Sequence, residues 1–115
     1  MFEVRKEVTE NISILFLVGK LDALTASQMK PVAKELESEE AVKLILDFQE
    51  LSLIDSSGIG AVVSIFKQVR SRGGTVKISG LHEQPKEVFE IQNLHKAMDV
   101  YPSVQQATES YQSSN

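Results

Sequence analysis

The sequence lacks cysteine altogether, which excludes disulfide bonds, thiolate catalysis and cysteine-ligated metal sites. It also lacks long hydrophobic runs. The longest apolar stretch, Ile14 to Val18, is far shorter than the roughly 20 residues that a membrane-spanning helix needs. The first residues are too acidic for a signal peptide. We therefore expect no membrane partner and a cytoplasmic protein.

Positive charge is scarce as well. Twelve Lys and Arg residues stand against sixteen Asp and Glu residues, which gives a formal net charge of −4. No basic run is long enough to follow a phosphate backbone, so we expect no direct binding of nucleic acid. A solvated helix face explains the basic residues of the second half better than a nucleic-acid patch does: Lys67, Arg70, Arg72 and Lys77.

What the sequence contains is the composition of one globular domain. Of its 115 residues, 42% are hydrophobic and 24% are charged, which suits a single core. We expect one domain over residues 1–115, ordered from about residue 2 to residue 110, with residues 112–115 frayed.

Strand patterns and helix patterns alternate along the chain, which predicts an α/β (α+β layer) fold: a four- to five-stranded mixed sheet with helices packed on it. The first strand should be an edge strand, and the second, apolar at almost every position, should be central. The expected strands cover residues 2–9, 12–18, 42–48 continued by 51–54, 76–79 and 98–101, and the expected helices cover 25–36, 59–72, 85–94 and 102–111.

Several local signals refine these elements. Thr25 and Gln28 have the spacing of a capping box, and Leu24 opens the apolar pattern of the first helix. Pro31 within this helix either kinks it or moves its start toward the proline. In the third helix we expect Val88, Phe89 and Ile91 to be buried.

The segment Asp55-Ser56-Ser57-Gly58 joins the third strand to the second helix and is the strongest functional lead. In its simplest interpretation it is a helix N-cap, with Gly58 and Gly60 relieving crowding around the turn. In the functional interpretation, a serine in the first helical turn accepts a phosphate that the free N–H groups tolerate and that a docking partner does not.

Catalytic alternatives fit this segment poorly. It lacks the spacing of a phosphate-binding P-loop and the G-x-S-x-G of a nucleophile elbow. A serine nucleophile needs a histidine base, and His82 and His95 are better explained as surface residues. The carboxylates show no metal or acid–base motif. We therefore expect no enzyme activity, cofactor or metal.

The order of elements resembles the bacterial anti-sigma factor antagonists of the STAS domain family over about residues 2–110. The resemblance depends on three segments and on the Gly73-Gly74 helix stop. The segments are Gly19-Lys20-Leu21-Asp22, Leu44-Ile45-Leu46-Asp47-Phe48 and Asp55-Ser56-Ser57-Gly58-Ile59-Gly60.

This resemblance implies a regulator that acts by binding. Its unphosphorylated form binds an anti-sigma factor that is also a serine kinase, which frees the sigma factor, and phosphorylation of Ser57 switches binding off. Ser56 is a less suitable phosphoacceptor, and a serine phosphatase acts on phospho-Ser57. The implied partner-binding residues are Asp22, Asp55, Ser56, Ser57, Gly58 and Ile59. A scaffold or small-ligand sensor module of the same family remains the alternative.

Overall fold

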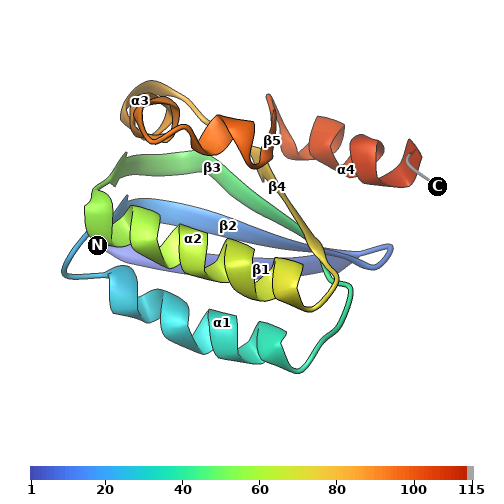
Figure 1. Cartoon of the computed structure of the whole chain (residues 1–115). Helices are drawn as coiled ribbons and strands as arrows, with labels where there is room; N and C mark the ends of the chain where they lie inside the picture. Colours follow the sequence, from blue (N-terminus) through green and yellow to red (C-terminus); the bar gives the residue numbers. More distant parts are fainter. Residues whose placement is uncertain (114–115) are drawn as a thin grey trace.

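A mixed five-stranded sheet forms the centre of residues 1–113, the part of the chain that the computed structural model describes (Figure 1). β1 pairs with β2 antiparallel, and the remaining neighbours pair in parallel. The predicted mixed sheet is confirmed, with β1 at an edge and β2 inside. In spatial order the strands are β1 (Phe2–Thr9), β2 (Ile12–Leu21), β3 (Lys43–Ile54), β4 (Thr75–Ser79) and β5 (Asp99–Tyr101).

Helices cover the sheet on two sides. Figure 1 shows α1 and α2 side by side, with α2 crossing in front of β1 and β2, and α3 and α4 at the opposite, upper margin of the strands. The helical segments are η1 (Ala26–Met29), α1 (Lys30–Glu37), α2 (Ser56–Ser71), α3 (Glu83–Ile91), η2 (Leu94–Lys96) and α4 (Val104–Ser113). Of the four residues expected to fray, Gln112 and Ser113 lie in α4, and residues 114–115 lie outside the described residues.

The main core lies between the sheet and the helices α1 and α2. Alternate residues of β2 and β3 are fully buried there against one stripe of α2, as the two-residue and 3.6-residue periods require. Near the middle of β3 the ring of Phe48 meets that of Phe89 from α3 edge-on within the same core, with centroids 5.3 Å apart. These contacts hold α3 against β3, the strand that leads to the Asp55-Ser56-Ser57-Gly58 segment.

A smaller core lies under α4, where Ala107 and Tyr111 pack on the isoleucines of β2 and β3. Two basic residues of the second half of the chain contact different parts of the fold. The Lys77 ammonium lies 4.3 Å from the centre of the Tyr111 ring. Arg72 Nε instead donates to the carbonyl of Glu39 at 3.0 Å.

The first helix differs from its predicted form. The Thr25 side chain does not cap it, so the predicted capping box is wrong. The segment opens as the 3₁₀-helix η1, and α1 starts at Lys30 with Pro31 in its first turn, where a missing N–H costs no hydrogen bond. Pro31 therefore sets the start of α1. Leu24 precedes the helix, and its side chain is 89% exposed rather than part of the core.

The third helix also corrects one prediction. Phe89 is buried and Val88 is half-buried, but Ile91 is 76% exposed. α3 begins at Glu83, which places Pro85 and Phe89, four residues apart, on the inner face. Ile91 lies two residues beyond Phe89 and so points to the opposite side.

Tyr111 anchors α4 through its hydroxyl, which donates to the carbonyl of Leu44 at 2.8 Å. Burial raises the pKa of Tyr111 from 10.0 to about 12. Because the folded state holds the phenol neutral, its contribution is intact below the unfolded pKa of about 10 and is lost as the pH rises toward 12. We predict that the wild-type unfolding free energy falls over this range.

The variant Tyr111→Phe should be about 1–2 kcal/mol less stable than wild type at pH 7. It should also show a shallower alkaline fall, measured by urea denaturation at stepped pH. Tyr101→Phe leaves Tyr111 in place and is the matched control. An alkaline slope that survives in Tyr111→Phe and disappears in Tyr101→Phe would contradict this assignment.

Candidate functional site: the serine turn at the start of α2

The Asp55 carboxylate organises the junction between β3 and α2. One oxygen, Oδ1, accepts the backbone N–H of Gly58 at 3.0 Å and so caps the helix. The other, Oδ2, accepts the backbone N–H of Ala23 at 3.1 Å. One side chain therefore closes the first turn of α2 and also ties it to the loop after β2.

That loop is a tight turn built on Asp22 and Thr25. Asp22 Oδ1 accepts the backbone N–H of Leu24 at 3.0 Å. The Thr25 hydroxyl accepts the N–H of Asp22 at 2.9 Å and donates to the carbonyl of Lys20 at 2.8 Å. Asp22 and Asp55, both predicted as partner-binding residues, thus lie on two joined segments, and Leu24 lies on the turn that Asp22 forms.

Ser56 and Ser57 occupy the first turn of α2, and both are exposed. The helix therefore begins about one turn earlier than the predicted start near Ile59, because Asp55 supplies the cap. The first two backbone N–H groups of α2 belong to these serines, and neither has an acceptor within residues 1–113. Two free donors and the positive end of the helix dipole thus lie beside both hydroxyls.

Gly58 and Ile59 are buried, so they position the serines from below. A Cβ at Gly58 would lie 2.3 Å from the carbonyl oxygen of Leu21 and 2.6 Å from Ile54 Cγ1. Only glycine therefore lets α2 approach the end of β2 this closely. Gly60 has nothing within 4 Å of such a Cβ, so the prediction that it relieves crowding is wrong.

Gln84, from the first turn of α3, is a positioning residue that sequence reasoning missed. Its side-chain amide pairs with both backbone groups of Ile54, accepting the N–H at 2.9 Å and donating to the carbonyl at 2.8 Å. This pairing extends β3 to its last residue before Asp55. The two residues are 30 positions apart, so no local sequence pattern predicts this contact.

His82 is engaged away from the serines. Its Nε2 lies 2.8 Å from the carbonyl of Gln49, and its Nδ1 lies 3.1 Å from Glu83 Oε2. Two hydrogen bonds raise the pKa of His82 above its usual value of 6.5. The bond to the Gln49 carbonyl has the larger effect, and the bond to Glu83 has the smaller one. In the described region neither His82 nor His95 makes a hydrogen bond to Ser56 or Ser57, so no serine–histidine pair forms.

No group of three or more His, Cys, Asp or Glu side chains is arranged to hold a metal ion within residues 1–113. None of the helices in this range has both the length and the apolar character needed to cross a membrane.

Comparison with known proteins agrees with this geometry. The model of the STAS domain matches residues 3–107. A relative from Listeria monocytogenes, named anti-sigma-B factor antagonist, is 32% identical over 98 residues, which cover 85% of each chain. The chain therefore belongs to the STAS domain family, among its anti-sigma factor antagonists, and the predicted resemblance is confirmed.

Solved structures share the fold. The Bacillus cell fate determinant SpoIIAA in its phosphorylated form matches with a TM-score of 0.73 and 23% identity, over 96% of this chain and 99% of that one. A sulfate transporter family protein from Wolinella succinogenes matches with a TM-score of 0.73 and 20% identity, over 89% and 85% of the two chains. The fold thus occurs both in regulators and in a protein of a transporter family.

The two glycines of the serine turn give a matched test of the site geometry. We predict that Gly58→Ala lowers the unfolding free energy by about 2–3 kcal/mol, because the methyl group collides with the Leu21 carbonyl. Gly60→Ala should raise it by about 0.5–1 kcal/mol, since the added methyl group meets open space within a helix. Urea denaturation measures both, and equal effects would contradict the close approach at Gly58.

Proposed function

We propose that this protein is an anti-sigma factor antagonist whose unphosphorylated form binds an anti-sigma factor that is also a serine kinase. Binding releases a sigma factor in the cytoplasm, phosphorylation of Ser57 ends the interaction, and a serine phosphatase restores it. The observation that carries the proposal is an exposed Ser57 hydroxyl on a rigid turn, beside two unused N–H donors and the Asp55 carboxylate.

The turn accommodates a phosphate with little cost to the fold. Phosphorylation adds about −1.5 to −2 charges at pH 7, and the start of α2 offers free N–H groups and a positive dipole end to that charge. The Ser57 side chain is exposed, so the phosphate enters solvent and displaces no core residue.

A bound partner does not accommodate it in the same way. Burying a dianion against a surface shaped for a neutral hydroxyl costs on the order of several kcal/mol, and about 1.4 kcal/mol corresponds to a tenfold change in affinity. The Asp55 carboxylate adds repulsion on the near side, because its oxygens are fixed by Gly58 and Ala23 and cannot turn away. A local charge change thus suffices to end binding.

Ser57 suits the phosphoacceptor role better than Ser56. Positions 57, 61 and 64 follow one another at helical spacing, so Ser57 lies on the side of α2 that faces η1 and α1. That side also carries the link from Asp55 to Ala23. A partner that binds across the start of α2 and the loop after β2 therefore buries Ser57 more than Ser56.

We predict that Ser57→Asp weakens binding to the cognate anti-sigma kinase at least tenfold with little change in melting temperature. Ser57→Ala should bind like wild type and accept no phosphate at this position. Calorimetric titration, with mass spectrometry after incubation with the kinase and ATP, measures these outcomes.

Ser103→Asp provides the matched control, because it adds the same charge at the start of α4, where Ser103 Oγ already accepts the N–H of Gln106. Equal affinities of Ser57→Asp and Ser103→Asp would contradict the proposal. A complex insensitive to every substitution in the turn would favour a scaffold or sensor module, and ester hydrolysis lost in Ser57→Ala would indicate an enzyme.

A further inference from the structure

Leu24 is an apolar side chain held out into solvent on a rigid turn. It is 89% exposed, although its backbone is held in place by hydrogen bonds. The Asp22 carboxylate holds the Leu24 N–H, and Asp55 holds the neighbouring N–H of Ala23. Because the turn is already ordered, a partner that buries Leu24 loses little conformational entropy on binding.

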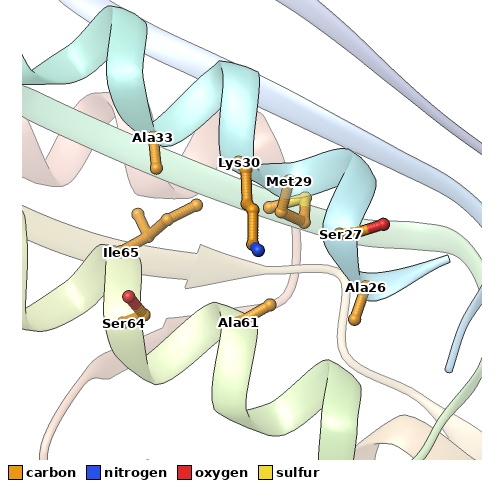
Figure 2. A pocket seen from close by; sticks show the side chains of 8 residues that line it. All are labelled: Ala26, Ser27, Met29, Lys30, Ala33, Ala61, Ser64 and Ile65. Carbon is orange, nitrogen blue, oxygen red and sulfur yellow. The ribbon is translucent and has the colours of Figure 1, made fainter. Parts of the chain in front are cut away.

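A groove of about 300 Å³ opens close by, between η1 and α1 on one side and α2 on the other (Figure 2). Such a volume is at the lower limit for small-molecule sites and suits one or two inserted side chains. Its floor and walls are mostly apolar, and it is lined by Ala26, Ser27, Met29, Lys30, Ala33, Ala61, Ser64 and Ile65.

Lys30 gives the groove a charge. Figure 2 shows its side chain reaching from α1 toward α2, where Ala61 and Ile65 face it. Within the part of the chain that the structure describes, the Lys30 ammonium has no ion-pair or hydrogen-bond partner. The occupant that satisfies both the walls and the ammonium is an apolar side chain accompanied by a carboxylate.

Leu24, Ser57 and the groove belong to one continuous surface. Ala61, which lines the groove, follows Ser57 by one helical turn on the same side of α2. Ala26 lines the opposite wall two residues after Leu24. The hydrogen bond from Ala23 N–H to Asp55 Oδ2 joins the Leu24 turn to the start of α2, and so connects the two parts of this surface.

We propose that the anti-sigma factor docks on this surface by a reciprocal fit. An aliphatic or aromatic side chain of the partner enters the groove with an adjacent Asp or Glu against Lys30, while Leu24 enters an apolar hollow of the partner. This inference deepens the proposed function and rests on it. In this arrangement the groove and Leu24 provide the binding affinity, and the phosphorylation state of Ser57 determines whether the partner binds.

A second copy of this chain is the competing occupant, because Leu24 lies beside the carboxylate of Asp22. That carboxylate, however, already accepts the Leu24 N–H at 3.0 Å and lies within 3.2 Å of the Thr25 hydroxyl. These bonds to Oδ1 fix the orientation of the carboxylate, and the oligomeric state decides whether its other oxygen pairs with Lys30 of another copy. Light scattering should find a monomer, and a dimer that Leu24→Ala dissociates would overturn the proposal.

Binding of the cognate anti-sigma factor to the full chain tests the groove. Lys30→Glu and Ala61→Leu should each weaken the complex about tenfold, the first by repelling the carboxylate and the second by filling the groove. The matched controls are Lys96→Glu and Ala97→Leu, which make the same changes at exposed residues outside the groove and should bind like wild type.

Leu24→Ala provides a variant that cannot disturb the core, and it should also weaken binding about tenfold at unchanged melting temperature. Wild-type affinity in all three groove and Leu24 variants, with Ser57→Asp still defective, would overturn this inference and leave the proposed function standing. Failure of the wild-type chain to bind any anti-sigma factor would overturn both.

Discussion

The interaction on which the site depends is the pair of hydrogen bonds accepted by one carboxylate, that of Asp55. Through Gly58 it closes the first turn of α2, and through Ala23 it fixes the loop after β2. Two segments that are independent in sequence thereby become one surface. Without this link the pairing of Leu21 with Ile54 would still hold the end of β2, but the turn that carries Asp22 and Leu24 would lose its direct bond to the start of α2.

The surrounding fold supplies the rigidity that this link needs. Gln84 holds the last residue of β3 from α3, and the close approach at Gly58 holds α2 against the end of β2. The serine turn is therefore supported from three directions, by a strand, a helix and a loop. A rigid support is what allows a change of charge to act on a partner without first being absorbed by movement of the turn.

Local patterns predicted much of this arrangement. The order of strands and helices, the edge position of β1 and the helix N-cap within Asp55-Ser56-Ser57-Gly58 could be read directly, because period, caps and turn residues are properties of neighbouring positions. The errors also have local causes. Thr25 and Gln28 have the spacing of a capping box, but the Thr25 hydroxyl binds the turn instead. Ile91 continues an apolar pattern beyond the face that α3 buries.

What could not be read are the contacts between distant positions. The link from Asp55 to Ala23 spans 32 residues, and that from Gln84 to Ile54 spans 30. Nothing in the local sequence around Asp55 indicates its bond to Ala23, and nothing around Gln84 indicates its bonds to Ile54. Equally, no sequence rule distinguishes the exposed Leu24 from the buried leucines around it, because its exposure depends on where β2 ends and η1 begins.

The span of the Asp55 link has a consequence for quality control. The serine turn acquires its complete shape only after β2 and β3 have paired. A nascent or misfolded chain therefore contains the sequence Asp55-Ser56-Ser57-Gly58 but lacks the folded surface formed by this turn and the loop after β2. A kinase that recognises the surface would pass over such chains. Under the proposed function, the cell would then count only correctly folded molecules when it sets the amount of free sigma factor.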